Sequence, residues 1–166
     1  MSSEELQAIE LLARVRYGRL ATSMRALPFL SVARHVVIDG RVVLRMHSGF
    51  GYHTACDGTV VAYGADNFDT ADPEGSSPEG SSPEGSSPEG SGPEGSGPGS
   101  DELWAVQFTG TAQIVHPEPG HRALFGDGPA RVNGERFDPA YLRLEPHFVS
   151  VHTLDFNASQ SIINTA

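Results

Sequence analysis

The residues best suited to chemistry lie between Arg41 and Asp69, around a glycine-containing bend. Arg45 and His47 come at the end of a β-branched and apolar run, and Ser48-Gly49-Phe50-Gly51 follows directly. Glycines let a backbone approach a ligand closely, and backbone N–H groups with a guanidinium can together hold an anion. The pattern therefore predicts an anion site at this bend. The alternative that the motif leaves open is an ordinary βαβ-like connection with a solvated arginine.

Short regular elements must position this bend. The run 42–44 predicts a strand, and Asp39-Gly40 before it is a turn pair that tolerates positive φ. Residues 52–57 fit one or two helical turns, and 59–65 are again β-branched and apolar, so a second strand is expected there.

The rest of the chain is predicted mainly as strands. Leu6, Ile9 and Leu12 recur at helical spacing after a capping box that starts at Ser2, which predicts a helix over 3–16. Gly110 marks an expected bulge or bend in the longest strand. The other expected elements are strands over 19–23, 29–38, 103–115, 141–144 and 148–154, a short helix over 117–124 and a loop over 126–138. Six or seven strands behind one helix predict a mainly β fold, an antiparallel barrel.

A repeat interrupts this pattern. Residues 73–100 read PEGSSPEGSSPEGSSPEGSGPEGSGPGS, with proline every five residues and no apolar side chain. Such a composition cannot bury enough surface to offset the entropy of ordering. We predict a single domain over 1–166, interrupted by a disordered loop insert at about 72–101. The alternative is a linker between two small modules of about 65 residues each, close to the lower size limit for independent folding.

Composition excludes several classes of function. The net charge is −10, which gives no electrostatic reason to bind nucleic acid or an anionic membrane. The chain contains no lysine, so it has no Schiff-base or lysine-base chemistry. A single cysteine, Cys56, excludes an internal disulfide and a cysteine zinc site, and we expect it to be a small apolar filler. No apolar run reaches the ~20 residues of a membrane span, and we expect a cytoplasmic protein.

Three histidines, His35, His47 and His53, could form a proton-transfer or metal cluster, because histidine titrates near neutrality. No i, i+4 or H-x-H pair occurs among them. The competing interpretation, separate surface or hydrogen-bonded histidines, leads us to predict no metal site.

Four stretches together carry a resemblance to a known family. They are Tyr17–Ser23 (YGRLATS), Pro28–Gly40 (PFLSVARHVVIDG), Arg41–Gly49 and Phe108–Ala112 (FTGTA). In this order they resemble the pyridoxamine 5′-phosphate oxidase-like family of flavin-binding split barrels. The resemblance implies a six-stranded antiparallel split barrel with Greek-key connections, an N-terminal helix and short connecting helices. It also implies a homodimer that holds FMN at the subunit interface.

The resemblance also carries over cofactor-binding positions. Gly51 stands where many relatives place a phosphate-binding lysine. Trp104 and Gln107 are three apart on one strand and should point to opposite faces, so both can line the cleft only if the strand is distorted. The full set carried over is Arg34, His35, Arg45, Met46, His47, Ser48, Gly51, Trp104 and Gln107.

The implied activity is that of a small FMN-dependent oxidoreductase with a small-molecule substrate. His35 and His47 are the candidate acids. We find no substrate-binding signature of the vitamin B6 oxidases in the C-terminal strands, which argues against that substrate. The alternative is a non-catalytic accessory protein on the same barrel that binds a flavin or haem, with His47 or His53 as the axial ligand of haem.

Overall fold

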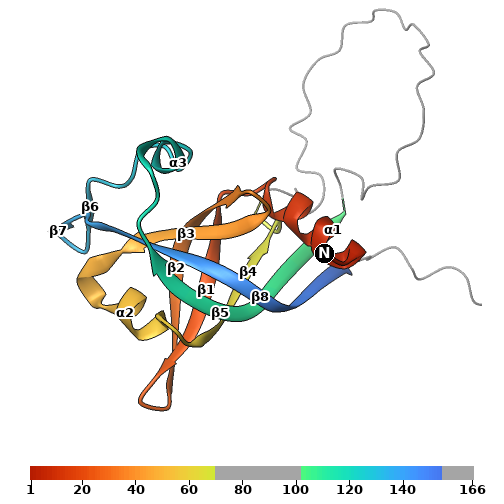
Figure 1. Cartoon of the computed structure of the whole chain (residues 1–166), viewed down its shortest axis with the longest axis horizontal. Coiled ribbons are helices and arrows are strands. Elements are labelled where there is room, and N and C mark those ends of the chain that lie inside the picture. Colours follow the sequence, from red (N-terminus) through yellow and green to blue (C-terminus); the bar gives the residue numbers. More distant parts are fainter. Residues whose placement is uncertain (70–101, 155–166) are drawn as a thin grey trace, which may run out of the picture.

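The computed structural model describes residues 1–69 and 102–154 (Figure 1). Six antiparallel strands close a barrel in the order β1-β2-β3-β8-β5-β4. Their bounds are β1 Tyr17–Met24, β2 Leu27–Ile38, β3 Arg41–His47, β4 Val60–Asp66, β5 Leu103–Val115 and β8 Pro139–Leu154. The predicted mainly β, six-stranded antiparallel barrel is confirmed. Strands from both sides of residues 70–101 build this one barrel, and the predicted insert itself lies outside the described residues.

Short helices and a hairpin complete the fold (Figure 1). They are α1 Ser3–Leu12, the 3₁₀ turn η1 Ser48–Phe50, α2 Tyr52–Cys56, α3 Pro119–Ala123, and the two-stranded hairpin β6 Arg131–Val132 and β7 Glu135–Arg136. Both hydrogen bonds of the capping box between Ser2 and Glu5 are present. The helix ends at Leu12, earlier than predicted: Arg14 and Val15 donate to the Leu11 and Leu12 carbonyl oxygens in tight turns, and the Arg16 carbonyl oxygen already accepts from the His35 N–H of β2.

The C-terminal strand differs most from expectation, because it is one strand rather than two. The register between β5 and β8 shifts between Thr109 and Gly110, where the chain opposite continues through Pro146. A bulge tolerates a proline, which cannot donate to the ladder. Gly110 fits there because a Cβ would collide with the Glu145 carbonyl oxygen. The hairpin β6–β7 lies within the stretch predicted as loop, 126–138.

The ends of β4 and β5 are joined at Asn67. Its backbone N–H donates to the Trp104 carbonyl at 3.3 Å, and its side-chain oxygen accepts from the Trp104 N–H at 2.8 Å. Its amide nitrogen donates to the Glu102 carbonyl at 2.9 Å. The two chain segments that lead into and out of residues 70–101 are therefore held together by Asn67 in addition to the β4–β5 ladder.

The barrel interior is filled by alternate residues of its strands, with α1 packed at one end. Tyr63, Phe108 and Leu142 are fully buried, and α1 contributes Leu11 and Leu12 to the same core. Strand β3 is buried on both faces from Val42 onward, because other segments cover its outer face. No helix among the described residues is both long and apolar enough to cross a membrane.

The β1–β2 turn offers a stability test. Arg25 and Ala26 have φ of 51° and 65°, a left-handed conformation that favours glycine. Ala26→Gly should therefore raise the free energy of unfolding, by about 0.5 kcal/mol. Urea denaturation measures it. The matched control is Ala55→Gly in helix α2, which should lower the same quantity by about 0.5–1 kcal/mol. Loss of stability in the turn variant would contradict the strain argument.

Candidate functional site

A cavity of about 360 Å³ opens beside the end of β3, between the outer side of β2 and the loop that carries the β6–β7 hairpin. Its lining comes from five places in the chain: Tyr17 of β1; Leu30, Ser31, Val32 and Arg34 of β2; Arg45, Met46 and His47 of β3; Phe50 and Tyr52 beyond the bend; and Pro129, Val132 and Phe137 of the loop. The volume lies within the range of small-molecule sites.

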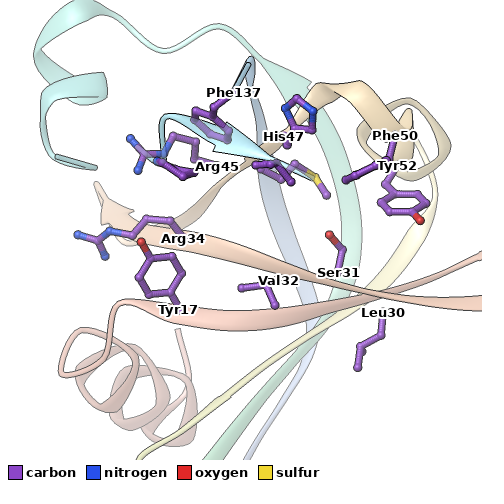
Figure 2. A pocket seen from close by; sticks show the side chains of 13 residues that line it. Tyr17, Leu30, Ser31, Val32, Arg34, Arg45, His47, Phe50, Tyr52 and Phe137 are labelled. Atoms are coloured by element: carbon purple, nitrogen blue, oxygen red, sulfur yellow. The ribbon is translucent and has the colours of Figure 1, made fainter. Parts of the chain in front are cut away.

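The two ends of the cavity differ in chemistry. Arg34 and Arg45 lie at one end and Phe50 with Tyr52 at the other (Figure 2). The arginines are neighbours because Arg34 pairs directly with Arg45 across the β2–β3 ladder, so their side chains share a face. Tyr17 pairs with Arg34 and lies beneath its guanidinium at 5.8 Å. The site therefore has both arginines at one end, beside aromatic rings, and only aromatic side chains at the other.

Arg45 fastens the loop to the barrel. Its guanidinium donates to the carbonyl oxygens of Gly126 at 2.7 Å and Asp127 at 3.2 Å. It also stacks near the rings of Phe125 and Phe137, at 5.3 and 5.8 Å from their centroids. Although charged, Arg45 is only 6% exposed. Its buried position is stabilised by the hydrogen bonds and aromatic faces, and the aromatic wall of the cavity depends on it.

Arg34 also donates to backbone carbonyls. Its side chain reaches Phe125 O at 3.3 Å, and Arg16 O and His35 O at 3.1 Å each. The structure thus brings the two predicted arginines together at one site. Both residues line the cavity, and their hydrogen bonds to backbone carbonyl oxygens hold the surrounding chain in place.

His47 is fixed in one tautomer at the cavity wall. Its Nδ1 accepts from the Asp138 backbone N–H at 3.1 Å, so in the neutral ring the proton sits on Nε2. That nitrogen is buried, forms no hydrogen bond among the described residues, and faces the Glu135 carboxylate at 3.6 Å. Phe137 stacks on the ring at 5.8 Å, and Phe50 meets it edge-on at 5.4 Å. A proton-carrying nitrogen beside a carboxylate can hold or pass on a proton.

Gly49 explains why the bend needs a glycine. A Cβ at this position would collide with the His47 ring and lie 2.9 Å from the Glu135 carboxylate. Gly51 is needed for a different reason: its φ is +70° where η1 ends and α2 begins, and there is open space around it. The first glycine makes room for the imidazole, and the second reverses the chain.

His35 lies inside the barrel, away from the cavity. Its Nε2 hydrogen-bonds the Leu12 carbonyl oxygen at 2.8 Å, its Nδ1 lies 2.6 Å from the Tyr63 hydroxyl, and the residue is 3% exposed. The carbonyl can only accept, so Nε2 donates. Adjacent strand residues point to opposite faces, so His35 and Arg34 cannot both face the cavity. Burial lowers the pKa of His35 despite the opposing effect of the Leu12 carbonyl.

The lowered pKa predicts a pH dependence of stability. Between the folded pKa and the unfolded value near 6.5, the unfolded chain binds more protons, so the free energy of unfolding falls as pH falls through this window. The slope contributed by one group reaches at most about 1.4 kcal/mol per pH unit. Urea denaturation from pH 7.5 to 5 should show this slope in the wild type, and His35→Leu should flatten it. An unchanged slope would contradict the assignment.

The other residues carried over by resemblance lie in several places. Met46 lines the cavity, whereas Ser48 donates from Oγ to the Asp138 carboxylate at 2.6 Å, outside the lining. Trp104 is buried in the core at 2% exposure. Gln107 is exposed on the opposite face of β5, as the spacing predicted, and lines a different hollow beside β4. Neither borders the 360 Å³ cavity.

Sequence reasoning missed the aromatic wall and the carboxylate of the site. Tyr17, Tyr52 and Phe137 line the cavity, and Glu135 faces His47 from the β6–β7 hairpin. The one local signal for the hairpin was Asn133-Gly134, a turn pair that tolerates positive φ. The histidines are dispersed: His53 lines another hollow, and no three His, Cys, Asp or Glu side chains of the described residues gather as a metal site.

Comparison with solved structures identifies the fold. The FAD binding protein from Mycobacterium smegmatis superposes with a TM-score of 0.58 at 16% identity, covering 93% of this chain and 98% of that one. This likeness is one of fold. The chain has the split-barrel fold. A candidate pyridoxamine 5′-phosphate oxidase from Corynebacterium glutamicum gives a TM-score of 0.52 at 16% identity, covering 91% and 94%.

A third split-barrel neighbour is the heme binding protein from Mycobacterium smegmatis, with a TM-score of 0.54, 15% identity, and coverage of 93% of this chain but 58% of that one. By sequence, the chain is 38% identical over 68 residues to the uncharacterized protein Rv0080 of Mycobacterium tuberculosis. The match covers 38% of this chain and 45% of that protein, so it spans less than half of the relative. No family model matches the chain.

Proposed function

We propose that the chain is a flavin-binding protein of the pyridoxamine 5′-phosphate oxidase-like type, with FMN in the 360 Å³ cavity, and that it acts as a small oxidoreductase. The observation that carries the proposal is the polarity of this cavity: two arginines lie at one end, Phe50 and Tyr52 at the other, and Phe137 stacks on His47 along the wall. A flavin nucleotide has the matching shape, with a planar apolar ring system and an anionic phosphate. Solved structures of the same fold include FAD-binding proteins.

The residues fit such a ligand by their chemistry. Phe50, Tyr52 and Phe137 offer flat apolar faces, and Val32 is 62% exposed beside them. Arg34 and Arg45 supply positive charge toward a phosphate, in place of the lysine that the sequence lacks after the bend. A bound flavin would supply hydride or electron transfer. The protein would hold the ring, exclude water and keep a proton at His47 Nε2 next to Glu135.

We also propose that a second copy of the chain covers the open side of this site. Leu30 and Val32 border the cavity and are 66% and 62% exposed, and Val60 on β4 is 61% exposed. Strand β1 lies between β2 and β4, and its Ala21 pairs with Ala62 of β4. The exposed Arg19 shares this side of β1. Exposed apolar side chains gathered on neighbouring strands are typical of an interface. Light scattering should report a dimer, and Val32→Asp should give a monomer. A wild-type monomer would overturn this part.

A haem-binding function is the second candidate, because His47 Nε2 lies buried at the cavity wall without a hydrogen bond among the described residues. The nearby Glu135 carboxylate disfavours it, since a haem iron would have to displace the hairpin that carries this residue. His53, the other predicted axial residue, lines a separate hollow.

The test is a spectrum followed by a titration. The purified chain should bind FMN with quenching of flavin fluorescence at micromolar concentration, and FAD in parallel shows which flavin is preferred. Flavin-dependent oxidation of NAD(P)H with an added electron acceptor would support an oxidoreductase. Flavin binding without turnover would support a non-catalytic accessory protein. A Soret band with added haem that is lost in His47→Ala would support the haem alternative. A chain that binds neither flavin overturns the proposed function.

A further inference from the structure

A second, separate cavity of about 370 Å³ lies on the outer face of β3 and β8, under the chain that leads into α3. Its polar lining residues are Asp39, Arg41, His116, His121 and Arg143, and its apolar ones are Ile38, Val43, Val115 and Pro117. None of these residues lines the proposed flavin cavity. We call this set the α3 groove.

The α3 groove is cationic in a chain that is strongly acidic overall. Two arginines and two histidines face one carboxylate there, while the whole chain carries a net charge of −10. Among residues 1–69 and 102–154, the one recorded ion pair joins His47 to Glu135. Arg41 and Arg143 therefore have no carboxylate partner within the described structure. Uncompensated cations that converge on a concave surface attract an anion.

Arg143 is built into the wall of the groove. It lies opposite Val43 on β3 and Gln113 on β5, and its Nη2 donates to the Gln113 side-chain oxygen at 2.8 Å. Its Nε is buried and has no hydrogen-bond partner among the described residues. Gln113 thus holds one edge of the Arg143 guanidinium in place. The side chain therefore loses less conformational entropy when its guanidinium binds an oxyanion.

We propose that the α3 groove binds a small phosphate monoester. Arginine forks match phosphate oxygens in a bidentate manner. The apolar side chains of Ile38, Val43 and Val115 would receive the organic part of the molecule. Asp39, at the β2–β3 turn, repels the anion and limits its affinity. The proposal requires no bound flavin and stands apart from the proposed function.

The charged groups that line the groove come from three parts of the chain. They are Asp39 and Arg41 from the β2–β3 hairpin, Arg143 from β8, and His116 and His121 from the α3 segment. Two arginines against one carboxylate leave a positive charge for an anion.

The experiment is calorimetric titration of the full chain at pH 6 and low salt, with phenyl phosphate as the probe. Phenyl phosphate should bind at one site, more tightly than inorganic phosphate, and phenol should not bind. Arg41→Gln and Arg143→Gln should each weaken binding by roughly tenfold. Arg41 is exposed, so its variant should fold even if loss of Arg143 disturbs the sheet.

Matched variants locate the bound anion. Arg14→Gln removes the same charge from an exposed residue just after α1, outside the groove, and should leave binding unchanged. Asp39→Asn should tighten it severalfold, and asparagine tolerates the φ of 51° at that turn. If Arg14→Gln and Arg41→Gln weakened phenyl phosphate binding equally, the effect would come from net charge alone, and the proposed site would be overturned. Loss of binding in Arg34→Gln, which lies in the other cavity, or no binding at millimolar phenyl phosphate would also overturn it.

Discussion

Arg45→Ala is expected to lower the free energy of unfolding by about 3 kcal/mol and to weaken flavin binding at least tenfold. The variant leaves the Gly126 and Asp127 carbonyl oxygens without their charged donor, and each such bond is worth about 1.5–3 kcal/mol. It also removes the group that Phe125 and Phe137 flank. Because this loop forms one wall of the cavity, stability and binding should fall together. Urea denaturation and flavin titration of the same preparations measure both.

The control for Arg45 is Arg131→Ala. Arg131 belongs to the same loop and also donates to a carbonyl, that of Gly134 at 2.8 Å, but it is exposed and its bond stays within the hairpin turn. Its loss should change stability by less than about 0.5 kcal/mol. Arg45→Lys should be intermediate, since one ammonium cannot reproduce a planar fork. If Arg45→Ala unfolds at the wild-type urea midpoint, the loop does not depend on Arg45.

The second large effect is expected inside the barrel, at His35. His35→Leu should cost about 3 kcal/mol, because it leaves the Leu12 carbonyl and the Tyr63 hydroxyl without their imidazole partner. The Tyr63 hydroxyl keeps one contact, with the Ala33 carbonyl at 3.2 Å. Burial raises the pKa of Tyr63, so this phenol stays neutral and serves as a donor. Denaturation at pH 7.5 keeps the comparison free of histidine protonation.

A double-mutant cycle separates this network from simple packing. Tyr63→Phe keeps the ring and removes only the hydroxyl, which should cost about 1–2 kcal/mol. If the two side chains act together, His35→Leu with Tyr63→Phe should cost about 1 kcal/mol less than the sum of the single variants. Strict additivity would show that the 2.6 Å contact contributes no coupling. Flavin binding should persist in folded variants, since His35 does not line the cavity.

Local sequence patterns predicted the strands well where turn residues such as Asp-Gly mark their ends clearly. The bounds of β5 agree with the prediction, because the run 103–115 is rich in β-branched and aromatic residues. The β2–β3 turn falls at Asp39-Gly40 as expected, with φ of 51° and 73°. The single strand β8 was missed because Pro146 reads as a break. Only the register shift opposite Gly110, a relation between distant segments, shows how the strand passes through it.

The site was predicted in part for the same reason. Arg34, Arg45 and His47 line one cavity because neighbouring strands pair in a register that places them on a common face. The two-residue period of a strand separates Arg34 from His35, but the resemblance placed both in the site, and the structure instead has His35 inside the barrel. Phe137 and Glu135 could not be found locally. They reach His47 only through the loop that Arg45 holds, about ninety residues away along the chain.

The three hydrogen bonds of Asn67 have a consequence for how this barrel can change. They extend the β4–β5 contact beyond the last ladder pair, Asp66 with Ala105, so the two ends of the intervening chain are held close together. The entropy of closing a loop grows only with the logarithm of its length. Additional repeats, or a whole reporter domain, could therefore be spliced into residues 70–101 without altering the cavities on the far strands. The position is a tolerant entry point for new sequence, in evolution and in the laboratory.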